Sequence, residues 1–441
     1  MSKCNDDFFD AKKDWSRVKD ALLGSYLPVY FAKVIHTKKP IVYIDCFAGA
    51  GKFKSGEDGS PRIALAERKS AIEHCRSFAI LPKIDMYFID PVYDKELAAN
   101  ISDYPHDDGH GSIKVIKGTY ETTVPEILSN IGDANVFLYV DPFGIRNLAN
   151  RIFANACKNF QGNVELLLNL NSFGFIREAC RVTGTLYKGE KIELEEREES
   201  IIDKSANAER VLSAIAGGEY WRKIIEDYHR DSQPSPKPSL MAERNFSACY
   251  RKTLSKSGGG PFKYVLDIPI KTKPGSYPKY RMVYATNHPD GCIAMADNMI
   301  RRADELYTEI QSGGQMSFFE VDANQEMKPD AAILTSLVRE CLSRQISSLQ
   351  NSVANFPGIH CSNPSKIPVK IRLRDIVADF FCENGVICAT KDIHSILASL
   401  ENKGEIVVSR IPNITKTGRP SKFWVEDKDK TIYIHLKESS Q

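Results

Sequence analysis

Two short segments of the chain carry residues suited to binding and to chemistry. The apolar run Ile41–Asp45 ends in a carboxylate and is followed by the small-residue turn 46–51. Glycine has no Cβ, so such a turn lets backbone N–H groups approach a nucleotide-type cofactor closely. Asp141 and Pro142 follow a second apolar run and offer a carboxylate and a carbonyl that can accept hydrogen bonds from an amine. Together the two segments predict a cofactor site and an amine site at the carboxyl edge of a parallel sheet.

The glycine turn fits one of three nucleotide-binding patterns. A P-loop is excluded because Cys46 replaces its first glycine and Phe53 replaces its Ser/Thr. A dinucleotide fingerprint needs three glycines, and this turn supplies two. The remaining pattern, Asp-x-Phe-x-Gly-x-Gly, resembles motif I of S-adenosylmethionine (SAM) methyltransferases, especially those acting on exocyclic amines of adenine in DNA or ribosomal RNA. A glycine-rich turn that binds no ligand is the alternative.

The resemblance to motif I implies a role for each residue of the turn. Asp45 is expected to hold the amino group of SAM, directly or through water, while the glycines admit its methionine part. No metal is expected, because the sulfonium leaving group is already activated. The turn residues expected to contact the cofactor are Phe47, Gly49, Ala50 and Gly51.

Two further residues are candidates for cofactor contacts. Asp90 ends the predicted second strand, where an acid in a doubly wound fold hydrogen-bonds a ribose hydroxyl. The alternative is a solvated turn residue, which the following Pro91 favours. Tyr120 follows the predicted third strand, where this fold contacts the adenine ring. Stacking on adenine and packing into the core are equally compatible with its position.

The segment Asp141-Pro142-Phe143-Gly144 resembles motif IV of amino-methyltransferases. DNA adenine methyltransferases carry Asp-Pro-Pro-Tyr there, and tRNA guanine-N2 dimethyltransferases carry Asp-Pro-Phe-Gly. The resemblance implies that the Asp141 carboxylate and the Pro142 carbonyl hold an exocyclic amine while Phe143 stacks on the base. A plain Asp-Pro turn is the alternative, and the same pair recurs at Asp90.

The pattern of apolar residues predicts a first domain, 1–310, of the α/β class with a Rossmann-like seven-stranded SAM-methyltransferase core. A helical insertion is expected at about 172–258, and it includes a mixed-charge run at 188–200. The expected strands are 41–45, 83–90, 112–117, 135–140, 163–170, 262–270 and 280–286, the last two forming a closing antiparallel pair. The expected flanking helices are 8–27, closed by Pro28, then 62–76, opened by Pro61, and 292–310.

The remaining residues predict an attachment to this core. Residues 311–368 are expected to form a linker and a helix, and residues 369–441 to form a domain that resembles a winged helix, with helices 372–383 and 390–403 and strands 386–389, 405–410 and 423–426. Between Gly385 and Gly404 there is room for one helix, whereas a helix-turn-helix needs two. A packing or protein-binding module is therefore the alternative. Basic residues expected to contact nucleic acid are Lys391, Lys416, Arg419 and Lys422.

Composition sets the broad class of the protein. The length of 441 residues predicts two or three domains, and a net charge of +2 means that any basic surface is local. The 11 cysteines include no C-x-x-C pair, which indicates reduced thiols and no metal site. No long apolar run is present, so we expect a cytoplasmic protein without a membrane partner. Motifs of zinc deaminases, H-E-x-x-H proteases and G-x-S-x-G hydrolases are absent from the sequence.

Over most of residues 8–437 the chain resembles the bacterial three-Cys-motif partner proteins (TcmP). The residues that carry the resemblance are Trp15, Lys19, Tyr26 and Leu27, the segment Tyr43–Gly51, Gly59–Pro61, Val140–Gly144 and Tyr280–His288, with the C-terminal module. The family implies a partner, a radical-SAM-like three-cysteine protein, in mobile or phage-related contexts. The pentapeptide Gln315–Phe319 also resembles the peptide that bacterial sliding clamps bind, or it is a hydrophobic strap over the core.

These observations predict a SAM-dependent methyltransferase that acts on an exocyclic amino group of a base in DNA or RNA. A second hypothesis is a non-catalytic adaptor that binds nucleic acid for a separate partner enzyme. A third is a regulator that recognises an operator through the C-terminal module. The sequence leaves open the target base, the number of methyl groups, the oligomeric state and the need for a partner.

Overall fold

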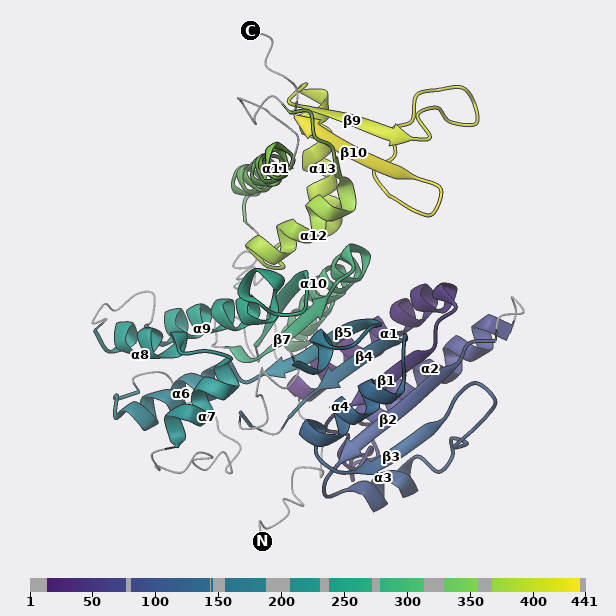
Figure 1. The fold of residues 1–441 in the computed structure, drawn as a ribbon, viewed down its shortest axis with the longest axis vertical. Helices are drawn as coiled ribbons and strands as arrows, with labels where there is room; N and C mark the ends of the chain where they lie inside the picture. Colours follow the sequence, from purple (N-terminus) through teal and green to yellow (C-terminus); the bar gives the residue numbers. More distant parts are fainter. Residues whose placement is uncertain are drawn as a thin grey trace. The chain divides into compact units, whose positions relative to one another are not determined.

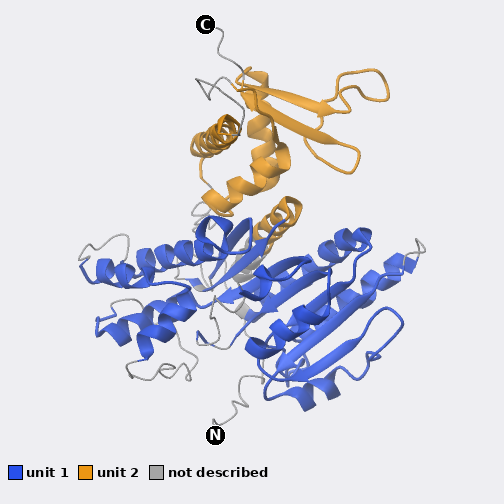
Figure 2. Ribbon diagram, viewed as in Figure 1, with its two compact units in different colours: residues 1–287, 305–315 blue, residues 288–304, 316–441 orange. Residues whose placement is uncertain are grey.

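The computed structural model describes residues 14–76, 81–142, 144–145, 155–187, 207–230, 238–271, 278–312, 329–355 and 367–436. The chain divides into two compact units (Figure 2). Unit 1 comprises residues 1–287 and 305–315, and unit 2 comprises residues 288–304 and 316–441. The helix α10 (Pro289–Ser312) contributes residues to both units.

Unit 1 is built on a seven-stranded sheet in the order β3-β2-β1-β4-β5-β7-β6 (Figure 1). Neighbouring strands from β3 to β5 are parallel, and β7 is antiparallel to both β5 and β6. The predicted α/β class and closing antiparallel pair are therefore confirmed. The strands are β1 Ile41–Asp45, β2 Ile84–Asp90, β3 Ile113–Lys117, β4 Asn135–Val140, β5 Asn163–Leu170, β6 Tyr264–Lys271 and β7 Pro278–Thr286.

The two faces of this sheet are covered by different helices. On one face the rings of Tyr43 and Phe137 stack 6.0 Å apart, and Phe137 meets Tyr26 and Tyr30 of α1. On the other face, Val42 and its neighbours join a core cluster with α4 and the insertion helices. The helices that flank the parallel strands are α1 Asp14–Val34, α2 Ser60–Arg76, α3 Asp94–Asn100 and α4 Tyr120–Asn130, with a short 3₁₀ turn at Ile35–Thr37.

The prediction that Pro28 closes the first helix is wrong. Helix α1 runs through Pro28 to Val34. Proline removes one backbone N–H from a helix, a cost that burial of an apolar face can offset. Leu27, Tyr30 and Phe31 are buried on either side of the proline, and their packing holds the helix together.

The predicted helical insertion is confirmed. It comprises α6 Ser172–Thr183, α7 Ala208–Ala216, α8 Tyr220–Arg230 and α9 Pro238–Leu254. The rings of Phe175 and Phe246 stack 4.0 Å apart, with Trp221 against the edge of Phe175. The mixed-charge run 188–200 lies outside the described residues.

Buried charges fasten the insertion to the sheet. Arg281 of β7 pairs with Glu243 of α9 and with Asp267 of β6. Arg251 of α9 also pairs with Asp267, at 2.9 Å. All four side chains are mostly buried, and these ion pairs compensate for the loss of their hydration.

In unit 2, helices α11 (Ala331–Ala354), α12 (Leu373–Asn384) and α13 (Thr390–Asn402) accompany a sheet ordered β8-β10-β9. The strands are β8 Ile371–Arg372, β9 Ile406–Ile411 and β10 Thr431–Leu436. The order along the chain is thus helix, strand, two helices and two strands. The predicted helices 372–383 and 390–403 correspond to α12 and α13. Between Gly385 and Gly404 the structure contains one helix, α13, as the sequence predicts.

Two predicted strands of the C-terminal module are wrong. Residues 386–389 form the irregular connection between α12 and α13, and the burial of Val386 and Cys388 explains the apolar pattern there. Residues 423–426 form no strand either, and β9 pairs instead with Thr431–Leu436. The Glu426 carboxylate accepts hydrogen bonds from Arg372 Nε and from the backbone N–H groups of Arg374 and Ile432. This segment therefore connects β8, α12 and β10.

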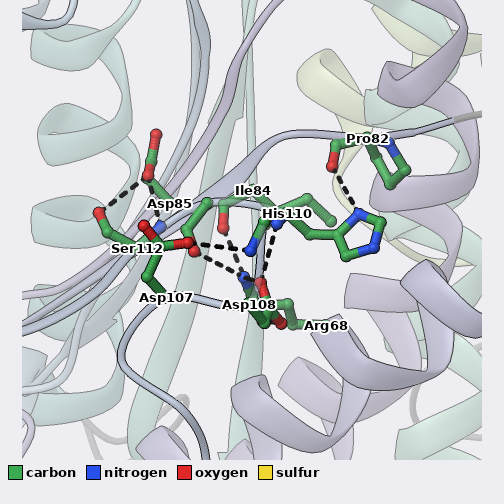
Figure 3. A network of polar contacts seen from close by, with 10 residues as sticks. Arg68, Pro82, Ile84, Asp85, Asp107, Asp108, His110 and Ser112 are labelled. Atoms are coloured by element: carbon green, nitrogen blue, oxygen red, sulfur yellow. Dashed lines mark hydrogen bonds and ion pairs between the residues drawn. The ribbon is translucent and has the colours of Figure 1, made fainter.

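A polar network at the amino edge of the unit 1 sheet fixes the loop before β3 (Figure 3). Arg68 donates to both carboxylate oxygens of Asp108 and to the Ile84 carbonyl. The contact with Arg68 lowers the pKa of Asp108 to about 2. Gly111 adopts φ +115°, and a Cβ there would lie against the Ile84 carbonyl oxygen at a distance that real Cβ atoms essentially never show.

Replacing Gly111 with alanine is expected to lower the free energy of unfolding by roughly 2–4 kcal/mol, because the new methyl group meets backbone and the backbone is left-handed. Gly109→Ala is the matched control, because Gly109 has φ +79° but nothing within 4 Å of an added Cβ. Its expected cost is about 1–2 kcal/mol. Urea denaturation of both variants measures the difference, and equal losses would contradict the clash.

Candidate functional site

The candidate site lies where the strand order of the unit 1 sheet reverses. Strands β1 and β4 are neighbours, β1 leads outward to β2 and β3, and β4 leads outward to β5 (Figure 1). In open α/β sheets, ligands bind in the crevice outside the carboxyl ends of strands at such a point. Asp45 is the last residue of β1 and Asp141 directly follows β4. The fold therefore brings the two predicted carboxylates to the same edge.

Asp45 is buried and accepts two hydrogen bonds, from the Phe47 N–H at 3.2 Å and from Ser60 Oγ at 2.7 Å. Burial raises the pKa of its carboxyl to about 7, and the negative charges of Asp141 and Asp20 add to the rise. The two hydrogen bonds act in the opposite direction. A cation bound beside Asp45 would favour its ionised form.

The glycine turn needs its glycines for their backbone conformation. Gly49 has φ +58° and Gly51 has φ +74°. A Cβ on Gly51 would also lie 2.7 Å from the side chain of Leu97. Within the described parts of the chain, the N–H groups of Ala50 and Gly51 donate no hydrogen bond. The contact of these N–H groups with a cofactor stays a prediction.

Asp90 supports the glycine turn. One carboxylate oxygen accepts from the Gly49 N–H at 2.9 Å, and the other accepts from the N–H groups of Val92 and Tyr93. A carboxylate has about four acceptor positions, and the described residues occupy three of them at Asp90. The structure thus brings Asp90 and Gly49 together, and the ribose contact of Asp90 stays a prediction.

Tyr120 and Phe47 pack against each other with ring centroids 5.2 Å apart. Tyr120 is the first residue of α4 and is buried in the core cluster. In this structure it therefore occupies the core-packing position, one of the two alternatives that its sequence position left open.

Asp141 is the centre of a polar cluster. Lys19 Nζ of α1 lies 2.9 and 2.7 Å from its two carboxylate oxygens. Asn169 Nδ2 of β5 donates to Oδ1 at 2.7 Å, and Tyr139 donates to Oδ2 at 3.4 Å. The Lys19 ammonium also lies 5.3 Å from the centre of the Tyr280 ring. The Lys19 ammonium lies opposite the Asp141 carboxylate, and the hydrogen bonds fix the orientation of that carboxylate.

Lys19 and Asn169 were not among the predicted site residues. Each leaves a signal in the sequence. Lys19 stands next to Val18 on the apolar stripe of its helix, and Asn169 interrupts the apolar end of β5. A polar side chain on a buried face needs a partner. The sequence does not identify the partner of Lys19 or of Asn169, because α1, β4 and β5 come together only in the folded protein.

The other predicted site residues lie as follows. Pro142 is buried beside Asp141, whereas Phe143 lies outside the described residues. Lys391 is exposed on α13, and Lys416, Arg419 and Lys422 are exposed between β9 and β10 in unit 2. The pentapeptide Gln315–Phe319 lies outside the described residues. Among the residues that are described, no group of three or more His, Cys, Asp or Glu is arranged to hold a metal ion.

No family model matches the chain, and no curated protein matches it. Among solved structures, the chain is similar to the crystal structure of the plantazolicin methyltransferase BamL in complex with triazolic desmethylPZN analog and SAH. The sequence identity is 11%, the match covers 61% of this chain and 86% of that chain, and the TM-score is 0.24. A TM-score this low adds nothing about function, so the α/β fold rests on the strand order itself.

Within the described ranges, every helix is too short or too polar to cross a membrane.

Proposed function

We propose that this protein is a SAM-dependent methyltransferase acting on an exocyclic amine of a nucleic-acid base. The observation that carries the proposal is the placement of Asp45 and Asp141 on neighbouring strands at the switch point, with the glycine turn between β1 and α2. Their types and order match the two methyltransferase motifs that the sequence resembles. The resemblance to TcmP proteins, and with it a three-cysteine partner protein, stays a prediction.

The residues at the turn fit SAM in three respects. The buried Asp45 carboxyl, with its pKa of about 7, gains from a neighbouring ammonium or sulfonium. The Ala50 and Gly51 N–H groups face no acceptor within the described chain, and Asp90 retains one acceptor position for a ribose hydroxyl. We expect Phe47 to line the same turn.

The amine is expected to lie between the turn and the end of β4. SAM bound at the turn would supply a methyl group on a sulfonium sulfur. Transfer would form a nitrogen–carbon bond and break the carbon–sulfur bond, with SAH as the leaving group and the extra proton of the amine released to water. The Pro142 carbonyl and the polar cluster at Asp141 provide hydrogen-bond acceptors that turn the nitrogen lone pair toward the methyl group. Phe143 is expected to stack on the base, and a base in a duplex must first be flipped out.

The test has two stages. Calorimetric titration of SAM into the full chain is expected to show binding in the micromolar range. SAM labelled in its methyl group is then incubated with pools of DNA and of RNA, and modified bases are identified by mass spectrometry. Methyl transfer to a base amine supports the proposal. Binding of SAM without transfer to either pool would contradict it.

The adaptor hypothesis remains the second candidate, and one observation favours it. Lys19 and Asn169 already donate hydrogen bonds to the Asp141 carboxylate, which would otherwise accept them from the amine. An adaptor predicts nucleic-acid binding without SAM affinity, and the same titration separates the two hypotheses. Binding of a sliding clamp through Gln315–Phe319 stays a further prediction.

Unit 2 is the expected contact for nucleic acid in either case, because its order of helices and strands is compatible with the predicted winged helix. The connection between β9 and β10 is ordered by bonds such as Thr415 N to Arg419 O at 2.8 Å. Its basic residues Lys416, Arg419 and Lys422 are exposed, and residues 411–425 contain no acid.

Replacing Lys416, Arg419 and Lys422 together with alanine is expected to weaken DNA binding. Each lost phosphate contact reduces the slope of log K against log salt by about 0.9, so the slope should fall by about 2–3. Fluorescence anisotropy over a range of salt concentrations measures this. A triple replacement of the exposed Lys69, Lys83 and Lys95 in unit 1 is the matched control. Equal effects of the two sets would contradict a specific role for unit 2.

A further inference from the structure

Among the described residues, none donates a hydrogen bond to the side-chain oxygen of Asn169. Asn169 lies near the carboxyl end of β5 and is 3% exposed. Its Nδ2 group donates to Asp141 Oδ1 at 2.7 Å, but its buried Oδ1 atom accepts no hydrogen bond from any residue that the structure describes. An acceptor buried in this way costs free energy unless a ligand or a water donates to it.

The orientation of this amide is fixed by Asp141. Reversing the amide would place the Asn169 oxygen against the Asp141 carboxylate, and two acceptors facing each other repel. Asp141 is in turn held by Lys19, whose side chain is 9% exposed. The contacts from Lys19 to Asp141 and from Asn169 to Asp141 therefore fix the orientation of the Asn169 side chain. Its oxygen lies beside the end of β4.

Asp141 itself has little capacity left for a substrate. Lys19 bonds to both carboxylate oxygens, Asn169 to one, and Tyr139 approaches the other at 3.4 Å. A neutral aromatic amine competes poorly with a buried ammonium, because displacing Lys19 would leave a charge without its partner. Within the described part of this cluster, the acceptor left without a donor is the side-chain oxygen of Asn169.

We propose that Asn169 Oδ1 accepts an N–H of the methyl-accepting amine and is a catalytic residue, with Asp141 as the positioning residue that orients it. The inference rests on the proposed function, since it names a contact to the same substrate. The amine has two N–H groups, and the Pro142 carbonyl is the expected acceptor for the other. Two acceptors on opposite sides would hold the nitrogen lone pair toward the methyl donor.

The kinetic test compares two leucine variants on the same strand. Asn169→Leu is expected to lower kcat for methyl transfer about 100-fold, with SAM affinity and the KM for nucleic acid nearly unchanged. Asn163→Leu, at the opposite end of β5, is expected to keep kcat. Full activity of Asn169→Leu would overturn the inference, and so would an effect on SAM affinity alone.

A second test does not depend on turnover. The side-chain amide resonance of Asn169 in ¹⁵N-labelled protein, assigned by comparison with Asn169→Leu, is followed while adenosine, cytidine or guanosine is added in the presence of SAH. A shift with at least one of these nucleosides, but not with inosine or uridine, which lack the exocyclic amine, supports the contact. No shift, or equal shifts with inosine and uridine, would overturn it even if the enzyme transfers methyl groups. A shift in a protein that transfers none would count against the proposed function alone.

Discussion

Replacing Asp45 with asparagine is expected to abolish detectable SAM binding and, at pH 8, to raise the melting temperature. The carboxyl has its pKa raised from 3.8 to about 7 by burial, so the folded state binds this proton more tightly than the unfolded state. Its contribution to stability is therefore present below pH 4 and is lost as the pH rises to about 7. Asparagine can keep the bonds with Phe47 and Ser60 but avoids the buried charge.

Calorimetry with SAM and thermal unfolding at several pH values measure both effects. The gain in melting temperature is expected to be on the order of several degrees at pH 8 and to shrink as the pH falls toward 4. Asp133→Asn is the control, because Asp133 is exposed and pairs with Lys39 at the surface. A variant that binds SAM as tightly as the wild type would rule out the predicted role of Asp45.

The same carboxyl predicts how SAM affinity depends on pH. If the ligand requires the ionised form, the apparent Kd should rise about tenfold for each pH unit below 7 and stay level above it. In Asp45→Glu, the carboxylate is retained in a longer side chain, and any residual binding should follow a similar profile. A flat profile between pH 5 and 8 in the wild type would show that Asp45 does not titrate with binding.

Much of the sheet could be predicted because its strands are apolar and bounded by turn residues. The predicted bounds of β4 and β5 agree with the structure, and every residue of β4 is buried. The positions of Asp45 and Asp141 follow from strand ends alone, since parallel strands align their carboxyl ends at one edge. The local pattern of apolar residues and turn residues was therefore sufficient to predict these strand bounds and the two carboxylate positions.

The contacts around Asp141 could not be predicted in the same way. Lys19 and Asp141 are 122 positions apart in the sequence, and their pairing depends on the packing of α1 against the sheet. The continuation of α1 through Pro28 likewise depends on buried neighbours that outweigh a local rule. In unit 2, the segment 423–426 has the composition of a strand, but β9 pairs with the segment that alternates better, in which Ile432 and Ile434 are fully buried.

Removing the Asp141 carboxylate is expected to have both a structural and a chemical effect. Asp141→Ala leaves the ammonium of Lys19 without its partner in a site where that side chain is 9% exposed. Breaking a buried pair in this way costs about 3–5 kcal/mol in the free energy of unfolding. Methyl transfer should also be lost, because Asn169 is no longer oriented. Asp133→Ala breaks an exposed pair and should cost at most about 1 kcal/mol.

The double variant Lys19→Met, Asp141→Leu separates the two effects. Replacing a buried ion pair with apolar side chains of similar volume is often neutral or stabilising, so most of the lost stability should return. Methyl transfer should stay at least about 100-fold below the wild type, because the leucine cannot orient the Asn169 amide. Urea denaturation and a methyl-transfer assay on one preparation measure the stability and the activity of the double variant. A stable double variant with wild-type transfer would mean that the cluster serves only to hold α1 on the sheet, and the amine would then have to be bound by other acceptors at the end of β4.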